Sequence, residues 1–177
     1  MSRKHTKFSQ RSSAERVAVS AVLVALALIF SYIEVLIPFN FGIPGIKLGL
    51  SNLIIVVALY RLGMGYALTI NMVRILLAGL LFGGVSGMIY SFAGGITSFL
   101  VMLILKKTNL FSPVGISLAG GVMHNVGQLC IAALVTETVK IFLYMPVLLI
   151  SGMITGCLLG FAATLILKRF REGTVTE

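Results

Sequence analysis

The sequence predicts an all-α, polytopic membrane protein: a bundle of six transmembrane helices. Of its 177 residues, 58% are hydrophobic and only 11% are charged, and the mean hydropathy is +1.07. A soluble domain averages nearer half apolar residues and about a quarter charged ones. At about 20 residues per crossing plus short loops, a chain of this length holds about six crossings in one compact domain.

The first three predicted crossings contain the most informative charge of the chain. They are Val17–Ile37, Leu48–Tyr60 and Gly63–Phe82, and a loop rich in Pro, Gly and Phe separates the first two. Arg74 falls near the middle of the third. A guanidinium in hydrocarbon costs at least a few kcal/mol. We therefore expect Arg74 to face the protein interior, a partner or a bound ligand.

The last three predicted crossings follow a turn at Gly83 and Gly84. They are Val85–Leu105, Pro113–Val135 and Ile141–Leu167, with Thr136–Lys140 as the turn before the last. The predicted organisation is a basic N-terminal tail over 1–16, a transmembrane domain over 17–169 and a C-terminal tail over 170–177.

The positive charges set the predicted orientation. With six crossings, one side of the membrane has only Lys47 and Lys140, and the side of the termini has the rest: Arg3, Lys4, Lys7, Arg11, Arg16, Arg61, Lys106, Lys107, Lys168, Arg169 and Arg171. The positive-inside rule then places both termini in the cytoplasm and the chain in the cell membrane. The net charge of +9 therefore reflects the membrane orientation and indicates attraction to anionic lipid. It does not indicate nucleic-acid binding.

A cleaved signal peptide is the alternative interpretation of the first apolar segment. Its apolar run is long for such a peptide, and no convincing A-x-A cleavage site precedes Glu34. We therefore predict an uncleaved first helix.

Small residues recur at helical spacing in three of the predicted crossings, and such rows let helix backbones approach closely in lipid. For the later rows we expect packing within the domain. For the first row, packing within the domain and docking of another membrane subunit both stay open. The rows are Ala18, Ala21 and Ala25; Gly83, Gly87, Ser91 and Gly95; and Gly152, Gly156 and Gly160.

The polar residues at membrane depth form the candidate ligand site. Asn71 and Arg74 share a helix face, as do His124 and Gln128, with Asn125 adjacent; Glu34, Lys47 and Asn52 flank the first outer loop. We expect Arg74 and Lys47 to bind an anionic or carbonyl group, and the amides and the imidazole to fix its orientation in a mostly apolar pocket. Two alternatives are hydrogen bonds between helices, worth about 1 kcal/mol, and an Arg74–Glu34 ion pair.

Several signatures of catalysis are missing from the sequence. It has no aspartate, no G-x-x-x-x-G-K-[ST] loop and no H-E-x-x-H motif. We therefore predict no catalytic residues, no metal site, no cofactor and no ATP hydrolysis by this chain. Cys130 and Cys157 fall inside predicted crossings, and we expect them to be small apolar packing residues.

Three segments carry a resemblance to a known family: the run Pro44–Asn52, the membrane Arg74 and the block His124–Gln128. Over about Glu15–Arg169, the chain resembles the bacterial Gx transporter family, also named heptaprenyl diphosphate synthase component I. That family is similar to the substrate-binding S components of energy-coupling factor (ECF) transporters. The resemblance implies a six-helix protein that binds a vitamin or similar small molecule near the outer face.

The same resemblance implies partners. S components dock a transmembrane coupling subunit, which carries two ATPases, through an A-x-x-x-A face that Ala21 and Ala25 match here. The family's other name implies a different role, as an accessory subunit of a prenyl synthase in isoprenoid or menaquinone metabolism. A stand-alone carrier is a third alternative, but it should show an internal hydropathy repeat, and none is convincing. The solute stays open: a naphthoate-type quinone precursor and several vitamins all fit.

Overall fold

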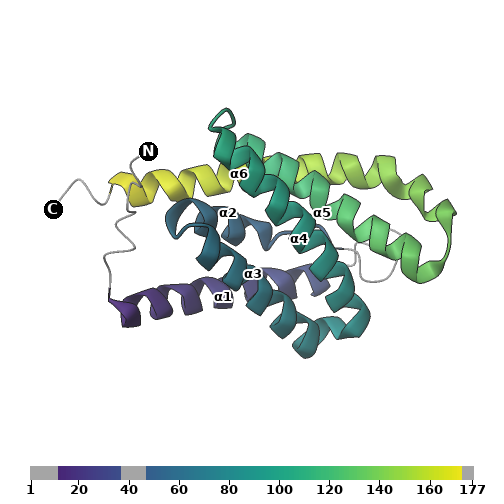
Figure 1. The fold of residues 1–177 in the computed structure, drawn as a ribbon, viewed down its shortest axis with the longest axis horizontal. Helices are drawn as coiled ribbons and strands as arrows, with labels where there is room; N and C mark the ends of the chain where they lie inside the picture. Colours follow the sequence, from purple (N-terminus) through teal and green to yellow (C-terminus); the bar gives the residue numbers. More distant parts are fainter. Residues whose placement is uncertain (1–11, 37–46, 173–177) are drawn as a thin grey trace.

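The chain is helical throughout the part that the structure describes. This computed structural model describes residues 12–36 and 47–172. Their elements, in chain order, are α1 (Ser13–Leu36), α2 (Asn52–Arg61), α3 (Met64–Ala78), the π-helical turn η2 (Gly79–Gly83), α4 (Gly84–Thr108), α5 (Pro113–Thr136), the 3-10 turn η3 (Val139–Tyr144) and α6 (Met145–Glu172) (Figure 1).

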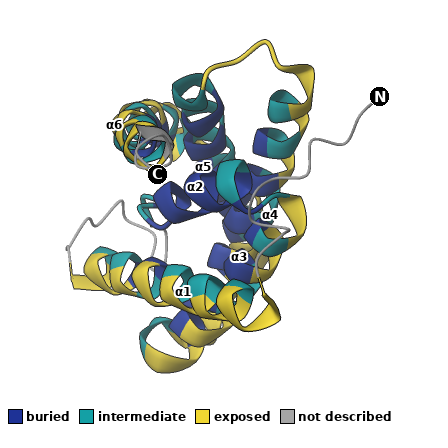
Figure 2. Ribbon diagram, turned by 90° about the vertical axis from the view of Figure 1, so that its left-hand side faces the viewer, coloured by how far each residue is buried: buried dark blue, intermediate teal, exposed yellow. Residues whose placement is uncertain are grey.

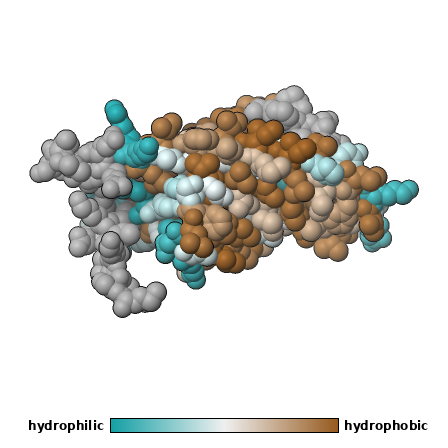
Figure 3. Space-filling model, turned by 90° about the horizontal axis from the view of Figure 1, so that it is seen from above, coloured by the Kyte–Doolittle hydropathy of each residue, from teal (hydrophilic) through white to brown (hydrophobic). Residues whose placement is uncertain are grey.

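Four helical segments among these residues are long and apolar enough to cross a membrane: Ser13–Leu36, Met64–Thr108, Pro113–Thr136 and Val139–Phe170. Figure 3 shows that apolar residues cover most of one long face, with hydrophilic residues toward its ends. The all-helical membrane class is therefore confirmed. Six separate crossings are not, because the predicted second crossing is only the 10-residue α2. That helix is about 15 Å long, against a hydrocarbon layer of about 30 Å.

The 45-residue segment Met64–Thr108 bends in its middle. Figure 1 shows the chain turning back between α3 and α4, at η2. Gly84, the first residue of α4, has a φ of +65°, which favours glycine. The predicted Gly83–Gly84 turn is therefore present, but the irregular backbone already begins at Gly79. A side chain at Gly79 would overlap Met88, since an ideal Cβ there lies 2.7 Å from the Met88 side chain.

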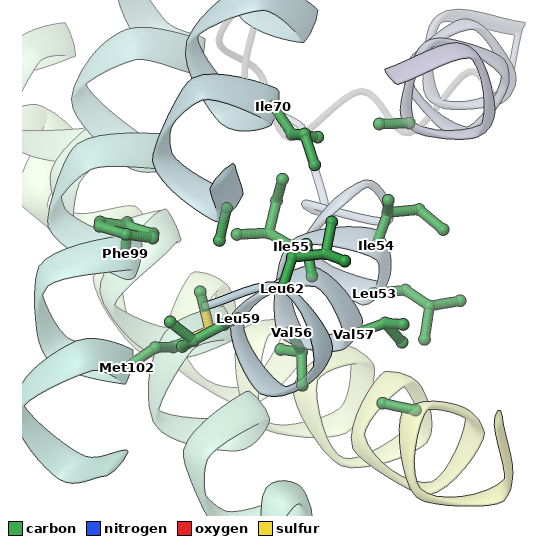
Figure 4. Packing of buried hydrophobic residues seen from close by; sticks show 14 of the residues in the cluster. Leu53, Ile54, Ile55, Val56, Val57, Leu59, Leu62, Ile70, Phe99 and Met102 are labelled. Atoms are coloured by element: carbon green, nitrogen blue, oxygen red, sulfur yellow. The ribbon is translucent and has the colours of Figure 1, made fainter. Parts of the chain in front are cut away.

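α2 lies at the centre of the molecule and is buried on all sides. Every residue from Leu53 to Leu59 is buried, and Figure 2 shows α2 among the other helices. Its side chains point outward in several directions, toward Ile70 of α3 and toward Phe99 and Met102 of α4 (Figure 4). A helix that is apolar all round is stable only when other helices cover it.

The C-terminal end of α2 is closed by side chains from other helices. The Lys106 ammonium donates a hydrogen bond to the Leu59 carbonyl and lies 4.8 Å from the centre of the Tyr60 ring. The Arg61 guanidinium lies 5.1 Å from the centre of the Phe170 ring of α6. Carbonyls in the last turn of a helix have no partner within it, so these cations stabilise that end.

α5 and α6 pack closely because glycines line their contact. An ideal Cβ on Gly152 would lie 2.9 Å from the Gly121 carbonyl oxygen, and one on Gly156 would lie 2.7 Å from the Leu118 Cα. The predicted role of the last small-residue row, packing within the domain, is confirmed. The predicted sixth crossing, Ile141–Leu167, lies within the helical segment Val139–Phe170, whose first turn is the 3-10 turn η3 before α6.

Candidate functional site

The predicted polar residues at membrane depth are almost completely buried. Their exposed fractions are at most 3%: Asn52 3%, Asn71 1%, Arg74 2%, His124 1%, Asn125 1% and Gln128 0%. Glu34 and Lys47 are partly buried. Buried polar groups are normally hydrogen-bonded, so their partners show which of them form one cluster.

Arg74 is held in place by Asn71, one helical turn earlier on α3. Its Nε and Nη2 both donate to the Asn71 Oδ1, over 3.1 and 2.9 Å. The Asn71 Nδ2 in turn donates to the Gly95 carbonyl of α4, over 3.1 Å. An ideal Cβ on Gly95 would lie 3.3 Å from the Arg74 Nη2. The missing side chain at residue 95 therefore lets the guanidinium lie against the α4 backbone.

The non-helical segment before α2 is fixed by side chains from α1 and α5. The Glu34 Oε1 accepts hydrogen bonds from the backbone N–H groups of Gly49 and Leu50, the latter over 2.8 Å. The Gln128 Oε1 accepts a hydrogen bond from the Lys47 backbone N–H, over 3.0 Å. This irregular backbone therefore has its donors satisfied within the protein, as apolar surroundings require.

The Lys47–Gln128 bond also orients the His124 ring. Because the Gln128 Oε1 accepts from Lys47, its Nε2 is the donor in the 2.7 Å contact with the His124 Nε2. An Nε2 that accepts a hydrogen bond has no proton, so a neutral His124 carries its proton on Nδ1. α4 approaches both side chains closely at Gly94, where an ideal Cβ would lie 2.8 Å from the Gln128 Cγ.

Asn52 and His124 meet over Gly49. An ideal Cβ on Gly49 would lie 2.9 Å from the Asn52 Nδ2 and 3.1 Å from the His124 Cδ2. The Asn52 Nδ2 has no hydrogen-bond partner among the described residues. A buried, unsatisfied amide donor costs about 1–3 kcal/mol, so this atom is a candidate for contact with a ligand.

Three charges act on one another at this site. The Glu34 carboxylate lies in the fields of both Arg74 and Lys47. An ideal Cβ on Gly83 would lie 3.5 Å from the Lys47 Nζ, so this side chain extends to η2. Burial lowers the pKa of the Lys47 ammonium, and the nearby Glu34 carboxylate acts in the opposite direction. Arg74 and Glu34 are thus electrostatic neighbours, and each has hydrogen-bond partners of its own.

A family model describes most of this chain. The model for heptaprenyl diphosphate synthase component I matches residues 23–166. The chain belongs to that family. No curated protein and no solved structure matches the chain. The component I match covers every predicted ligand residue and Ala25, whereas Ala18 and Ala21 precede it.

Asn125 of this component I chain lies apart from the cluster. Its Nδ2 donates to the Leu148 carbonyl over 2.7 Å and to the Ser151 hydroxyl over 3.3 Å, both on α6. The neighbouring His124 and Gln128 face the opposite way, toward α4 and the segment before α2. The structure therefore gives Asn125 a place between α5 and α6, while the other seven predicted residues come together.

Ala18, Ala21 and Ala25 lie on the exposed side of α1. Of the 24 residues of this helix, the buried ones are Ala27 and Ser31, and Figure 2 shows α1 at the edge of the molecule. The loop between the first two predicted crossings, Pro38–Lys47, which the sequence predicts as a lid over the ligand site, falls outside the described residues except for Lys47.

Sequence reasoning overlooked the glycines that make room for the site. Gly49 and Gly94 contact its side chains most closely, and neither was a candidate residue. A signal for Gly49 is present, since it stands between Lys47 and Asn52 in the motif Pro44–Asn52. Gly94 has no comparable signal, because it is one of many glycines in apolar helices.

Proposed function

We propose that this chain is a non-catalytic membrane component that binds a small anionic solute at the buried cluster. One observation carries the proposal: α1, the segment before α2, α3 and α5 bring two cations, a carboxylate, an imidazole and several amides together, and α4 covers them at Gly94 and Gly95. A mostly apolar interior with a few converging polar groups is the usual composition of a small-molecule site.

The irregular backbone before α2 supports this proposal. Non-helical backbone at membrane depth is tolerated where it is buried in protein or lines a cavity. Transporters commonly place their substrate beside such broken helices. Here the segment from Lys47 to Ser51 is non-helical and lies against His124 and Gln128. The proposed solute contacts are Arg74, Lys47, Asn52, His124 and Gln128, with Asn71 and Glu34 as the groups that position them.

The transport role is that of an S component, which captures the solute from outside and delivers it to an ATP-driven ECF module. In this role both termini lie in the cytoplasm, and Ala18, Ala21 and Ala25 dock a transmembrane coupling subunit. The exposed small face of α1 supports it. Since the sequence has no P-loop, ATP hydrolysis belongs to partner subunits.

The family description favours a second role, as a membrane accessory subunit of heptaprenyl diphosphate synthase. The chain has no aspartate, so it lacks the acidic clusters that hold magnesium and diphosphate in prenyl transfer. In this role it would anchor a catalytic partner at the membrane. A soluble prenyl synthase would then co-purify with it.

Native mass spectrometry of the detergent-purified protein tests solute binding. We expect a co-purified small molecule in the parent protein and its loss in Arg74→Ala, with Arg74→Lys a poor substitute because an ammonium does not reproduce a planar guanidinium contact. Asn125→Ala is the control, since Asn125 lies apart from the cluster. A folded, monodisperse Arg74→Ala that retains the same molecule would contradict the proposal.

Identifying the proteins that co-purify from solubilised membranes distinguishes the transport role from the accessory role. The Ala21→Trp variant tests whether the small face of α1 is the docking surface. Under the transport role, the parent co-purifies with a membrane subunit and ATPases. Ala21→Trp should then lose these partners and keep its thermal stability and bound solute, because Ala21 is exposed. Recovery of a prenyl synthase, with no ATPase, would favour the accessory role.

A further inference from the structure

The charges of the candidate site do not balance. Lys47 and Arg74 are cations, and Glu34 is the one carboxylate whose charge acts on both. His124 accepts a hydrogen bond at Nε2 and is neutral in that state. The described site therefore has one positive charge without a counter-charge.

Glu15 and Glu137, which the structure describes elsewhere in the molecule, do not supply the missing negative charge. The stretch 37–46 contains no charged residue. Glu15 lies on the first turn of α1 and Glu34 near its end, and 19 residues of helix separate them by about 28 Å. Glu137 is exposed at the end of α5. A buried charge is favoured when it has a partner of opposite charge, and a bound anion would provide one here.

The protein holds the Glu34 carboxylate in place within the site. Its Oε1 accepts the backbone N–H groups of Gly49 and Leu50, which ties the carboxylate to the segment that also contains Lys47. The carboxylate is therefore fixed near both cations, and its single charge offsets that of one of them. The unpartnered Nδ2 of Asn52 offers a further donor to a bound anion beside the remaining cation.

We propose that the site takes a ligand with a single negative charge, a carboxylate on a small apolar body, and that Glu34 sets this charge by neutralising one of the two cations. This inference rests on the proposed function of solute binding. A diphosphate or a dicarboxylate would place additional negative charge beside Glu34. Like charges brought together in a dry site disfavour binding strongly.

Isothermal titration calorimetry with probes of one ring system tests the proposal. The probes are 2-naphthamide, 2-naphthoate and naphthalene-2,3-dicarboxylate, which are neutral, singly and doubly charged at neutral pH, with inorganic pyrophosphate as a fourth. For the parent protein in detergent at low salt, we expect 2-naphthoate to bind at least about tenfold more tightly than the other three.

Glu34→Gln should reverse this order. A glutamine Oε1 still accepts the Gly49 and Leu50 N–H groups, so the segment keeps its anchor while the site gains a positive charge. In this variant the dicarboxylate should then bind more tightly than 2-naphthoate, and well over tenfold more tightly than it binds the parent. Glu137→Gln makes the same change in net charge at an exposed position and should leave the order unchanged.

The outcomes separate this inference from the proposed function. If the parent binds the dicarboxylate or pyrophosphate as tightly as 2-naphthoate, or if Glu34→Gln leaves the order unchanged, the charge assignment is wrong although anion binding stands. If the parent binds none of the four probes, the anion-binding function itself is overturned.

Discussion

Gly49 shows how a single backbone position supports the candidate site. Its φ is +81°, a conformation that other residues adopt at a cost of about 1–2 kcal/mol. Its carbonyl accepts the Asn52 N–H over 2.9 Å, which leads directly into α2. Because residue 49 has no side chain, the Asn52 amide and the His124 ring both reach the space above it.

Gly49→Ala is expected to destabilise the protein and to abolish solute binding. The new Cβ would add strain and would displace the Asn52 Nδ2 and the His124 Cδ2, 2.9 and 3.1 Å away. Gly63→Ala is the control, because Gly63 also has a positive φ, +95°, but nothing within 4 Å of its ideal Cβ. Thermal unfolding and native mass spectrometry of both variants make the comparison. Retained binding in Gly49→Ala would contradict the placement of the site.

The contacts of a site residue could be predicted from the sequence when its partner lies nearby in the chain. They could not be predicted when the partner lies far away in the chain. A guanidinium inside an apolar run predicted the burial of Arg74, and the i,i+3 spacing predicted that Asn71 shares its face. The bond from the Lys47 N–H to Gln128 joins residues 81 positions apart, and no local pattern contains it. Asn125 could not be separated from Gln128 by residue type, since both are buried amides.

At the scale of the helices, glycines allow α5 and α6 to pack closely against each other. At Gly160 an ideal Cβ would lie 2.7 Å from the Val114 Cα. Small residues at such contacts are the main source of close helix packing in lipid. Their four-residue spacing is visible in sequence, so this contact could be predicted. The second apolar run, Leu48–Tyr60, is short for a crossing in the sequence too, but the burial of α2 on all sides could not be predicted from it.

Gly156→Ala is expected to destabilise the protein by about 1–3 kcal/mol, as overpacking does. Its Cβ would lie 2.7 Å from the Leu118 Cα and 2.8 Å from the Ser117 carbonyl oxygen, and backbone atoms cannot move aside cheaply. Gly65→Ala on α3 has nothing within 4 Å and should be neutral or stabilising by up to about 1 kcal/mol. Thermal unfolding in one detergent compares the two, and equal effects would argue against a tight α5–α6 contact.

Over the whole molecule, the two ends of α5 provide the test of orientation. Leu110 precedes this helix and Val139 follows it, and they are 82% and 79% exposed. In a background with Cys130 and Cys157 replaced by serine, Val139→Cys should react with a membrane-impermeant maleimide in intact cells. Leu110→Cys should react only after permeabilisation, because the lysine-rich end belongs inside. Labelling of both in intact cells would contradict the predicted topology.

The central position of α2 has a consequence for how the chain is made. A helix of 10 residues is well below the length of about 17–25 apolar residues that enters a bilayer independently. During synthesis, α2 therefore becomes buried only once the helices that cover it are in place. α6, which packs on α2, is made after the other described helices. A nascent chain that stops before α6 leaves part of α2 uncovered, so such fragments should be preferred substrates for membrane proteases.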